Sequence, residues 1–239
     1  KLLIYMDISV IIPCYNEEQN LEIPATQTVL FFKENNISGE VVIVDDGSFD
    51  NTLKVAEKLS VSNPEIKVIS HKKNRGLGQA CLSGFKVANG EWVTWLPGDG
   101  QLFSDEMIKM CSPEEGIDFV IGRAPLKERI VVDNLWRYVL SNGWRKIIKI
   151  LFRFDVNDIV GYAFRRKLLS SITLNSSTGL LNIEFPIKVI KSGVKVKYYN
   201  IRLKPRISGK SKVNNISTII KSFWEIIKHW FVQDLNTNR

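Results

Sequence analysis

The stretch V-V-I-V-D-D-G-S, residues 41–48, indicates the fold class. Its four apolar β-branched residues are typical of a strand that is buried on both faces, as in a parallel sheet. Polar residues end the strand, and Asp50 or Asn51 can then cap a helix that runs to about Leu59. A buried strand that passes through a polar turn into a helix is the repeating unit of an α/β fold.

Strands and helices alternate through the first hundred residues, which predicts a mainly parallel central sheet with helices on both faces. The second half is less regular, but its apolar pattern still indicates further strands and a helix. The expected strands are residues 8–13, 41–44, 66–70, 91–96, 119–122, 159–164 and 194–201. Two expected helices end near residues 35 and 59, and two others span residues 78–88 and 179–191.

Polar residues gather where the expected strands end. Residues 15–17 follow the first strand, Asp45 and Asp46 follow the second, and Asp99 follows the fourth. Ligands of open parallel sheets bind outside the carboxyl ends of the strands. Residues 97–100 (P-G-D-G) taken alone indicate only a turn, because these residue types dominate turns. Their place beside a second acidic strand end favours a binding function.

Such a strand end can hold a nucleotide through a divalent cation that bridges a diphosphate to the protein. Asp99 would supply one oxygen and Gln101 another, and both oxygen types suit Mg²⁺ or Mn²⁺. Asp46 would accept hydrogen bonds from the base or the ribose.

The composition limits the classes of protein that fit. The chain has 239 residues, 44% of them hydrophobic, which suffices for one globular core with a smaller appended region. Its net charge of +8 suits phosphates, nucleotides, anionic lipid headgroups or nucleic acid. Of these partners, we expect no nucleic acid. The two histidines lie far apart in the sequence, which argues against a zinc site or a Ser-His-Asp triad.

The location is expected to be cytoplasmic. Three cysteines without metal-ligand spacing favour reduced thiols. Residues 1–5 are too short for the apolar core of a signal peptide, and Met6 can be the native start. The sequence contains no run of about 18 uncharged apolar residues, so it predicts no membrane span.

Two glycine-containing stretches resemble phosphate-binding motifs without meeting their requirements. Residues 76–78 (G-L-G) begin like a dinucleotide fingerprint, but the third glycine is missing and the stretch follows the third strand. Residues 209–211 (G-K-S) resemble the end of a P-loop, but Lys204 stands where its leading glycine should be. We therefore expect neither an NAD site nor an NTPase.

The C-terminal residues 213–239 are expected to form an amphipathic helix and a tail. The helix either packs on its own domain or binds a membrane surface or a partner. Its apolar face would consist of Ile216, Ile219, Ile220, Phe223, Trp224, Ile227, Trp230 and Phe231.

Four segments together resemble the family 2 glycosyltransferases, which have a GT-A fold. They are residues 10–18 (V-I-I-P-C-Y-N-E-E), 44–52 (V-D-D-G-S-F-D-N-T), 74–76 (N-R-G) and 98–101 (G-D-G-Q). The resemblance covers most of residues 8–212, and the order and spacing of the segments are specific. Within the family, the second half is most similar to the dolichyl- or polyprenyl-phosphate mannosyl- and glucosyltransferases. The supporting residues are Gly122, Arg123, Trp136, Arg137, Ser141, Asp158, Gly161 and 206–212 (R-I-S-G-K-S-K).

This resemblance implies a single catalytic domain at residues 6–212, with a nucleotide-binding half at 6–101 and an acceptor-binding half at 102–212. The implied donor nucleotide site comprises Pro13, Tyr15, Glu17, Val44, Asp46, Arg75, Gly98, Arg206 and Lys212. The implied acceptor phosphate site comprises Arg123, Arg137 and Ser141. Asp99 and Gln101 would hold the metal, and Asp99, Arg123 and Arg137 would be catalytic.

Pro97 departs from the family pattern, which usually has an acid there, giving Asp-x-Asp. Proline offers no side-chain oxygen, so one contact to the metal or its surroundings is missing. We expect activity to survive, because the other donor and acceptor residues are present.

The implied reaction is an inverting transfer of a hexose from a nucleotide-sugar, of GDP-mannose or UDP-glucose type, to a polyprenyl or dolichyl phosphate. Alternatives are transfer to a sugar hydroxyl in cell-surface polysaccharide assembly, and a degenerate nucleotide-sugar binder without activity. A hydroxyl acceptor needs a base, and Asp158 or Glu184 could serve. Each has a simpler reading, with Asp158 in a turn and Glu184 on a solvated helix face.

A lipid acceptor also implies contact with the inner face of the membrane. The chain would attach peripherally through residues 136–154 or 216–231, or through a membrane partner subunit.

Overall fold

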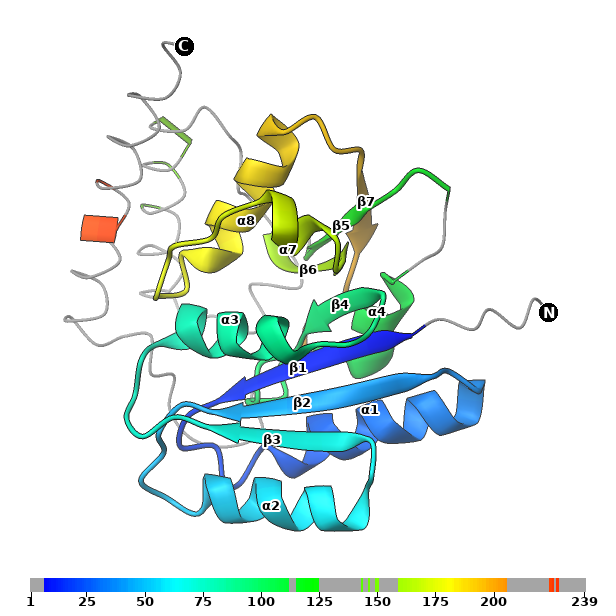
Figure 1. The fold of residues 1–239 in the computed structure, drawn as a ribbon, viewed down its shortest axis with the longest axis vertical. Helices are drawn as coiled ribbons and strands as arrows, with labels where there is room; N and C mark the ends of the chain where they lie inside the picture. The colour runs from blue at the N-terminus through cyan, green and yellow to red at the C-terminus, as the bar shows by residue number, and fades with distance from the viewer. Residues whose placement is uncertain are drawn as a thin grey trace.

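The computed structural model describes residues 7–111, 115–124 and 159–205, together with single positions at 143, 146, 149, 150, 224, 225 and 227. Within these residues, seven strands form one sheet in the order β3-β2-β1-β4-β6-β5-β7 (Figure 1). The strands are β1 (Ile8–Cys14), β2 (Gly39–Asp45), β3 (Ile66–Ser70), β4 (Trp92–Trp95), β5 (Phe119–Arg123), β6 (Ile159–Arg165) and β7 (Val196–Asn200).

Helices cover both faces of this sheet. One face packs against α1 (Glu22–Asn35), α2 (Thr52–Ser62) and α4 (Ser104–Lys109). The other face packs against α3 (Leu77–Val87), α7 (Leu168–Ser171) and α8 (Leu181–Lys191). The expected α/β architecture with a mainly parallel sheet is therefore confirmed.

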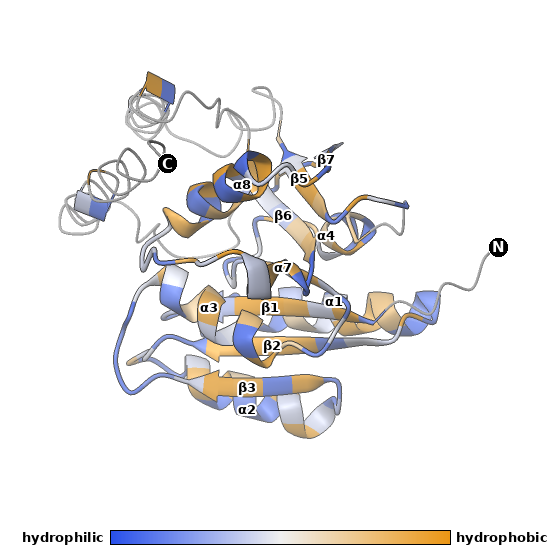
Figure 2. Cartoon of the chain, turned by 45° about the horizontal axis from the view of Figure 1, so that its top comes forward, coloured by the Kyte–Doolittle hydropathy of each residue, from blue (hydrophilic) through white to orange (hydrophobic). Residues whose placement is uncertain are grey.

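The central strands supply both cores by alternation. In β1, Val10 and Ile12 belong to the core on the α1 side, whereas Ile11 belongs to the core on the α3 side. All three side chains are fully buried, and Figure 2 shows β1 and β2 as hydrophobic along most of their length. Because both faces are covered, the continuous apolar run in the sequence is the pattern that a central parallel strand requires.

The strand directions determine at which edge of the sheet each strand ends. β3, β2, β1 and β4 are mutually parallel, and β6 runs antiparallel to both β4 and β5. β5 therefore points the same way as β4, and β7 is parallel to β5. The carboxyl ends of β1, β2, β4, β5 and β7 consequently all lie at one edge of the sheet, which we call the carboxyl edge.

The boundaries agree with the sequence predictions except at two short helices. α4 and α7 were not expected, because six and four residues are too few to show a helical period. Asn51 occupies the N-cap position of α2, as one of the two predicted alternatives, but its side chain makes no cap hydrogen bond. The Asp50 carboxylate, one residue earlier, accepts a hydrogen bond of 2.9 Å from the Thr52 N–H. Asn51 instead donates its side-chain amide to Glu18.

The predicted C-terminal helix lies largely outside the described residues, although Trp224, Glu225 and Ile227 are helical. In the described part of the chain, no helix combines the length and the apolar character that crossing a membrane requires.

Candidate active site

Two polar segments flank the end of β1 at the carboxyl edge. The N–H of Asp46 donates to the carbonyl of Cys14 over 2.8 Å, and the N–H of Gly98 donates to the carbonyl of Pro13 over 3.2 Å. These bonds attach the acidic end of β2 and the turn after β4 to the last two residues of β1. These strand ends therefore lie together at the carboxyl edge, as the sequence predicts.

The turn after β4 explains the residues on either side of Asp99. The Gly100 N–H donates to the Pro97 carbonyl over 3.3 Å, and Gly100 has a φ of +72°, which favours glycine. A Cβ on Gly98 would lie 2.9 Å from the Cβ of Cys14, so the close approach to β1 also requires glycine. Within this turn, the Gln101 N–H donates to Oδ1 of Asp99 over 3.1 Å.

The carboxylate of Asp46 is held by the loop that precedes α3. Its Oδ1 accepts from the Arg75 N–H at 2.9 Å, and its Oδ2 accepts from the Gly76 N–H at 2.8 Å. Nδ1 of His71 lies 2.7 Å from the same Oδ1, and the Asp46 residue is only 3% exposed. Three N–H groups thus compensate for the burial of this charge.

The polar turn after β1 is fastened to the segment after β2. Asn16 adopts a left-handed conformation, with a φ of 53°, and exchanges hydrogen bonds with Ser48 and Phe49, both of 2.9 Å. Tyr15 packs edge-to-face on Phe49, which is 83% exposed. A partly exposed aromatic pair therefore stands beside the acidic strand end, where a nucleoside could stack on one of the rings.

Glu17, Val44 and Pro13 were predicted to line the nucleoside pocket, and the structure buries all three. Glu17 accepts a hydrogen bond of 2.7 Å from the side chain of Asn20, and its N–H donates to the Thr52 hydroxyl. The contact of Pro13, Glu17 and Val44 with a nucleoside stays a prediction.

Arg123 ends β5 at the same edge. Its guanidinium carbon lies 3.6 Å from the centroid of the Tyr198 ring, a cation–π contact that fixes the head of the side chain. Its Nε is buried and has no hydrogen-bond partner among the residues that the structure describes. A buried N–H without a partner is costly, and an anionic ligand would satisfy it.

The chain after β7 returns to the turn after β4. Leu203 forms a bridge with Leu102, and the Lys204 N–H donates to the Gln101 carbonyl over 3.0 Å. Burial lowers the pKa of the Lys204 ammonium, and the nearby Asp105 partly offsets this effect. Lys204 was not among the predicted site residues, because its position depends on a pairing between distant parts of the sequence.

A loop at residues 175–178 packs against the start of α3. The Gly78 N–H donates to the Ser177 carbonyl over 3.0 Å. A Cβ on Gly76 would come within 2.5 Å of that same carbonyl oxygen. Glu225 accepts hydrogen bonds from the N–H and hydroxyl groups of Ser177 and Thr178. Sequence reasoning missed the contacts of Glu225 and His71, because no periodicity or motif marks these two residues.

Glu184 is not the solvated helix residue of the simpler reading, because it is only 6% exposed. Its carboxylate accepts hydrogen bonds from the N–H groups of Asn175 and Ser176 and from the Lys188 ammonium. Burial alone would raise the pKa of Glu184, but the hydrogen bonds from Lys188 and Ser176 bring it below its ordinary value. A carboxylate held ionised in this way is suited to fixing the loop rather than to accepting a proton.

Five predicted site residues lie outside the described residues, so the structure does not place them. They are Arg137, Ser141, Asp158, Arg206 and Lys212.

The side chains of the turn after β4 fit a divalent cation only if a bound ligand supplies further oxygen atoms. Within the described ranges, no group of three or more His, Cys, Asp or Glu side chains could enclose a metal ion. Asp99 and Gln101 provide a carboxylate and an amide oxygen, which is the sparse set that Mg²⁺ typically uses when phosphates and waters complete its shell.

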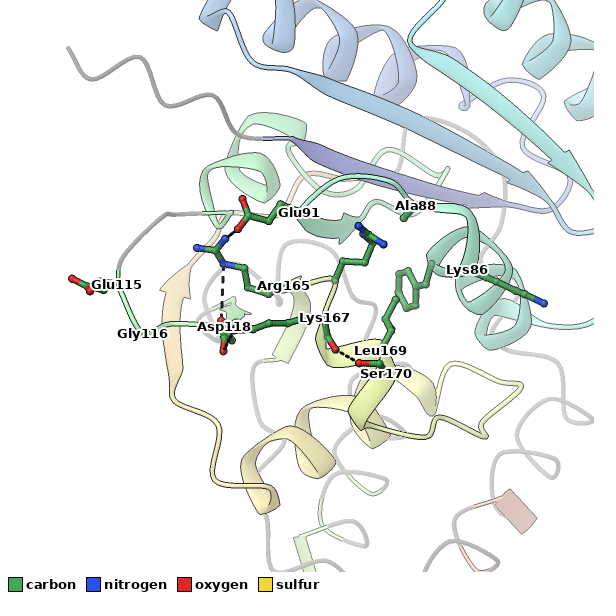
Figure 3. Close-up of a pocket in the computed structure, with 12 residues that line it drawn as sticks. Lys86, Ala88, Glu91, Glu115, Gly116, Asp118, Arg165, Lys167, Leu169 and Ser170 are labelled. Carbon is green, nitrogen blue, oxygen red and sulfur yellow. Dashed lines mark hydrogen bonds and ion pairs between the residues drawn. The ribbon is translucent and has the colours of Figure 1, made fainter.

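A separate cavity of about 1100 Å³ lies at the opposite, amino edge of the sheet (Figure 3). Arg165 forms an ion pair there with Glu91, and the Lys167 ammonium lies 2.8 Å from Asp118. The acids and bases of this cavity therefore largely neutralise one another, and the predicted site residues lie elsewhere.

Comparison with known proteins agrees with this geometry. Residues 9–171 match the family described as Glycosyl transferase family 2, so the chain belongs to this family. The predicted family is confirmed.

Two curated relatives support the predicted branch. A dolichol-phosphate mannosyltransferase of Pyrococcus furiosus is 30% identical over 233 residues, which cover 93% of this chain and 64% of the relative. A polyprenol monophosphomannose synthase of Mycolicibacterium smegmatis is 30% identical over 216 residues, which cover 86% and 80%. The chain thus spans less than two thirds of the length of the Pyrococcus protein.

Solved structures confirm the GT-A fold. Mannosyl-3-phosphoglycerate synthase from Rubrobacter xylanophilus superposes with a TM-score of 0.67 at 14% identity, over 98% of this chain and 75% of that one. Glucosyl-3-phosphoglycerate synthase from Mycobacterium tuberculosis, in complex with Mn²⁺, UDP and phosphoglyceric acid, gives 0.66 at 16% identity, over 94% and 78%.

Proposed function

We propose that this chain transfers a hexose from a nucleotide-sugar to a polyprenyl phosphate, with inversion at the anomeric carbon. The observation that carries the proposal is that Asp99, after β4, and Arg123, at the end of β5, lie at the same edge of the sheet. One offers a carboxylate that could hold a metal ion, and the other offers a guanidinium whose buried Nε has no hydrogen-bond partner among the described residues. The names of the two curated relatives support a lipid-phosphate acceptor.

The donor would lie across the ends of β1, β2 and β4. Asp99 and Gln101 would hold Mg²⁺ or Mn²⁺, which when bound neutralises the diphosphate leaving group. Mn²⁺ and UDP are bound by the mycobacterial structural neighbour, which supports this assignment. The Lys204 backbone is bonded to Gln101, and the Lys204 ammonium lies 4.8 Å from the centroid of the Phe103 ring. Its positive charge would contribute to the field around the departing phosphates.

The acceptor would approach from β5. Arg123 would bind its phosphate and direct one oxygen at the anomeric carbon; a C–O bond forms there as the bond to the nucleoside diphosphate breaks. The second pKa of a phosphate monoester is about 6, so the attacking oxygen is already ionised near neutral pH. No residue has to remove a proton, and this agrees with the engagement of Glu184 in the 175–178 loop. A sugar-hydroxyl acceptor would need such a base.

The test offers a radiolabelled nucleotide-sugar with Mn²⁺ and either polyprenyl phosphate or an oligosaccharide. We expect label in the organic phase with the lipid. Label in the saccharide alone would favour the hydroxyl acceptor, and donor binding without any transfer would favour a non-catalytic binder. Arg123→Ala should raise KM for the lipid phosphate by about ten- to a hundred-fold and leave KM for the donor unchanged.

We also propose peripheral attachment at the cytoplasmic membrane face. Trp224 is 65% exposed, which supports an aromatic contact with the lipid interface. Flotation with anionic liposomes is the measurement. A chain that stays at the bottom of the gradient without a partner would contradict direct contact and favour a membrane partner subunit.

A further inference from the structure

We propose that Asp46 selects the base of the donor. The number of positions on its carboxylate that can still accept a hydrogen bond favours uridine over guanosine. The inference rests on the proposed function, because it takes Asp46 as the group that meets the base. It assigns to His71 the role of a positioning residue that sets this selectivity.

A carboxylate has about four lone-pair positions for hydrogen-bond donors. Among the residues that the structure describes, Asp46 uses two on Oδ1, for the Arg75 N–H and His71, and one on Oδ2, for the Gly76 N–H. One acceptor position remains, on Oδ2. Two of the three donors are backbone groups of a loop fixed by tight glycine contacts, so they cannot be withdrawn without moving that loop.

The hydrogen bond from His71 does not depend on how the ring is protonated. Nδ1 lies 2.7 Å from a carboxylate oxygen, and a proton must stand between two such acceptors. Nε2 lies 2.9 Å from the hydroxyl of Ser83, which can either donate or accept. The neutral ring and the imidazolium therefore both donate from Nδ1 to Asp46.

Uracil and guanine make different demands on a carboxylate. Uracil presents one N–H between two carbonyl oxygens, so a single acceptor position is enough. Guanine presents two adjacent donors, N1–H and N2–H₂, which a carboxylate satisfies by using both of its oxygens. On Asp46 the Oδ1 is occupied, so one guanine donor would be left unpaired in a buried site.

Arg75 supplies the complementary part for a pyrimidine. Its backbone N–H is bound to Asp46, and its guanidinium donates one hydrogen bond, to Gln79, among the described residues. The remaining N–H groups of a guanidinium are donors for a carbonyl oxygen such as those of uracil. The one open acceptor position on Asp46 and the remaining N–H groups of Arg75 beside it match the N–H and the carbonyl oxygens of uracil.

Calorimetric titration of UDP and GDP into the whole chain with Mn²⁺ tests the inference. We expect UDP to bind about ten- to a hundred-fold more tightly, the cost of one unpaired donor. GDP binding as tightly as UDP would overturn the base selectivity and leave the proposed transferase function standing. Binding of neither nucleotide would overturn the proposed function and the inference with it.

Two variants separate the role of His71 from a structural one. His71→Phe keeps the ring volume and frees a position on Oδ1, so the UDP-to-GDP affinity ratio should fall toward one. Ser83→Ala removes only the second contact of the ring and should leave the ratio unchanged. An unchanged ratio in His71→Phe would contradict the role of His71. If His71→Phe does not fold, Asp46→Asn must lower the UDP-to-GDP ratio, and a retained ratio would contradict the assignment.

Discussion

Two acids at the carboxyl edge of the sheet and two bases at the amino edge are held in different ways. At the carboxyl edge, Asp46 and Asp99 accept hydrogen bonds from backbone N–H groups, which are fixed in place. At the amino edge, Arg165 and Lys167 are paired with the acids Glu91 and Asp118. Backbone donors orient a carboxylate without cancelling its charge, whereas an ion pair neutralises it. Preorganised charge of the first kind is what binding and catalysis require.

Replacement of Asp99 should give the largest effect. Asp99→Ala removes the carboxylate that would hold the metal, and loss of several kcal/mol of charge stabilisation lowers turnover by about a thousand-fold. Asp118→Ala, an acid at the amino edge, serves as the matched control and should retain activity. The assay is transfer of label with Mn²⁺ present; full activity in Asp99→Ala would exclude the metal role.

Gly76→Ala should destabilise the carboxyl edge and so lower the free energy of unfolding. Gly76 has a φ of +95°, and a Cβ there would meet the Ser177 carbonyl at 2.5 Å, so we expect a loss of about 2–4 kcal/mol of unfolding free energy. Gly193→Ala is the control, because its φ is +78° but no atom lies within 4 Å of the added Cβ. Its cost should stay near 1–2 kcal/mol. Equal losses in urea titrations would show that the 175–178 loop does not constrain this turn.

Glu184→Gln should reduce stability by about 1–2 kcal/mol at neutral pH, because charge-assisted hydrogen bonds to the 175–178 loop are weakened. The folded-state pKa of Glu184 lies below its ordinary value of 4.5. Its stabilisation is therefore present above that value and is lost as the pH falls through the lower folded pKa. Urea titrations at pH 7 and at acid pH should show the difference from wild type shrinking. Glu57→Gln, on an exposed helix position, is the control, and a pH-independent difference would contradict this account.

Lys167→Ala should give the smallest effect. Lys167 is 67% exposed at its side chain, and an ion pair of this kind contributes at most about 1 kcal/mol. We expect unchanged transfer activity and a change in unfolding free energy near the limit of detection. A marked loss of transfer would mean that the amino edge takes part in the reaction.

The fold could be predicted because its signals are local. The apolar runs of β1 and β2 are long enough to be recognised, and the acids that end the strands mark the carboxyl edge. The short α4 and α7 could not be found, because they complete less than two turns or little more than one.

The site was predictable in its residue types and less so in its contacts. The turn around Asp99 follows from its glycines, and Arg123 follows from the family resemblance. The hydrogen bond from His71 to Asp46, the pairing of Lys204 with Gln101 and the contact of Glu225 with Ser177 join residues that are distant in sequence. No periodicity encodes such contacts, since they depend on how the sheet and its loops pack.

The central claim is that the carboxyl edge, through Asp99, holds the metal-bound diphosphate. Calorimetric titration of UDP with Mn²⁺ into the wild type, Asp99→Asn and Asp118→Asn tests it most directly, because the two variants make the same chemical change at opposite edges of the sheet. We predict that Asp99→Asn loses the Mn²⁺-dependent part of UDP binding and that Asp118→Asn binds as the wild type does. Unchanged binding in Asp99→Asn, or an equal loss in both variants, would contradict the claim.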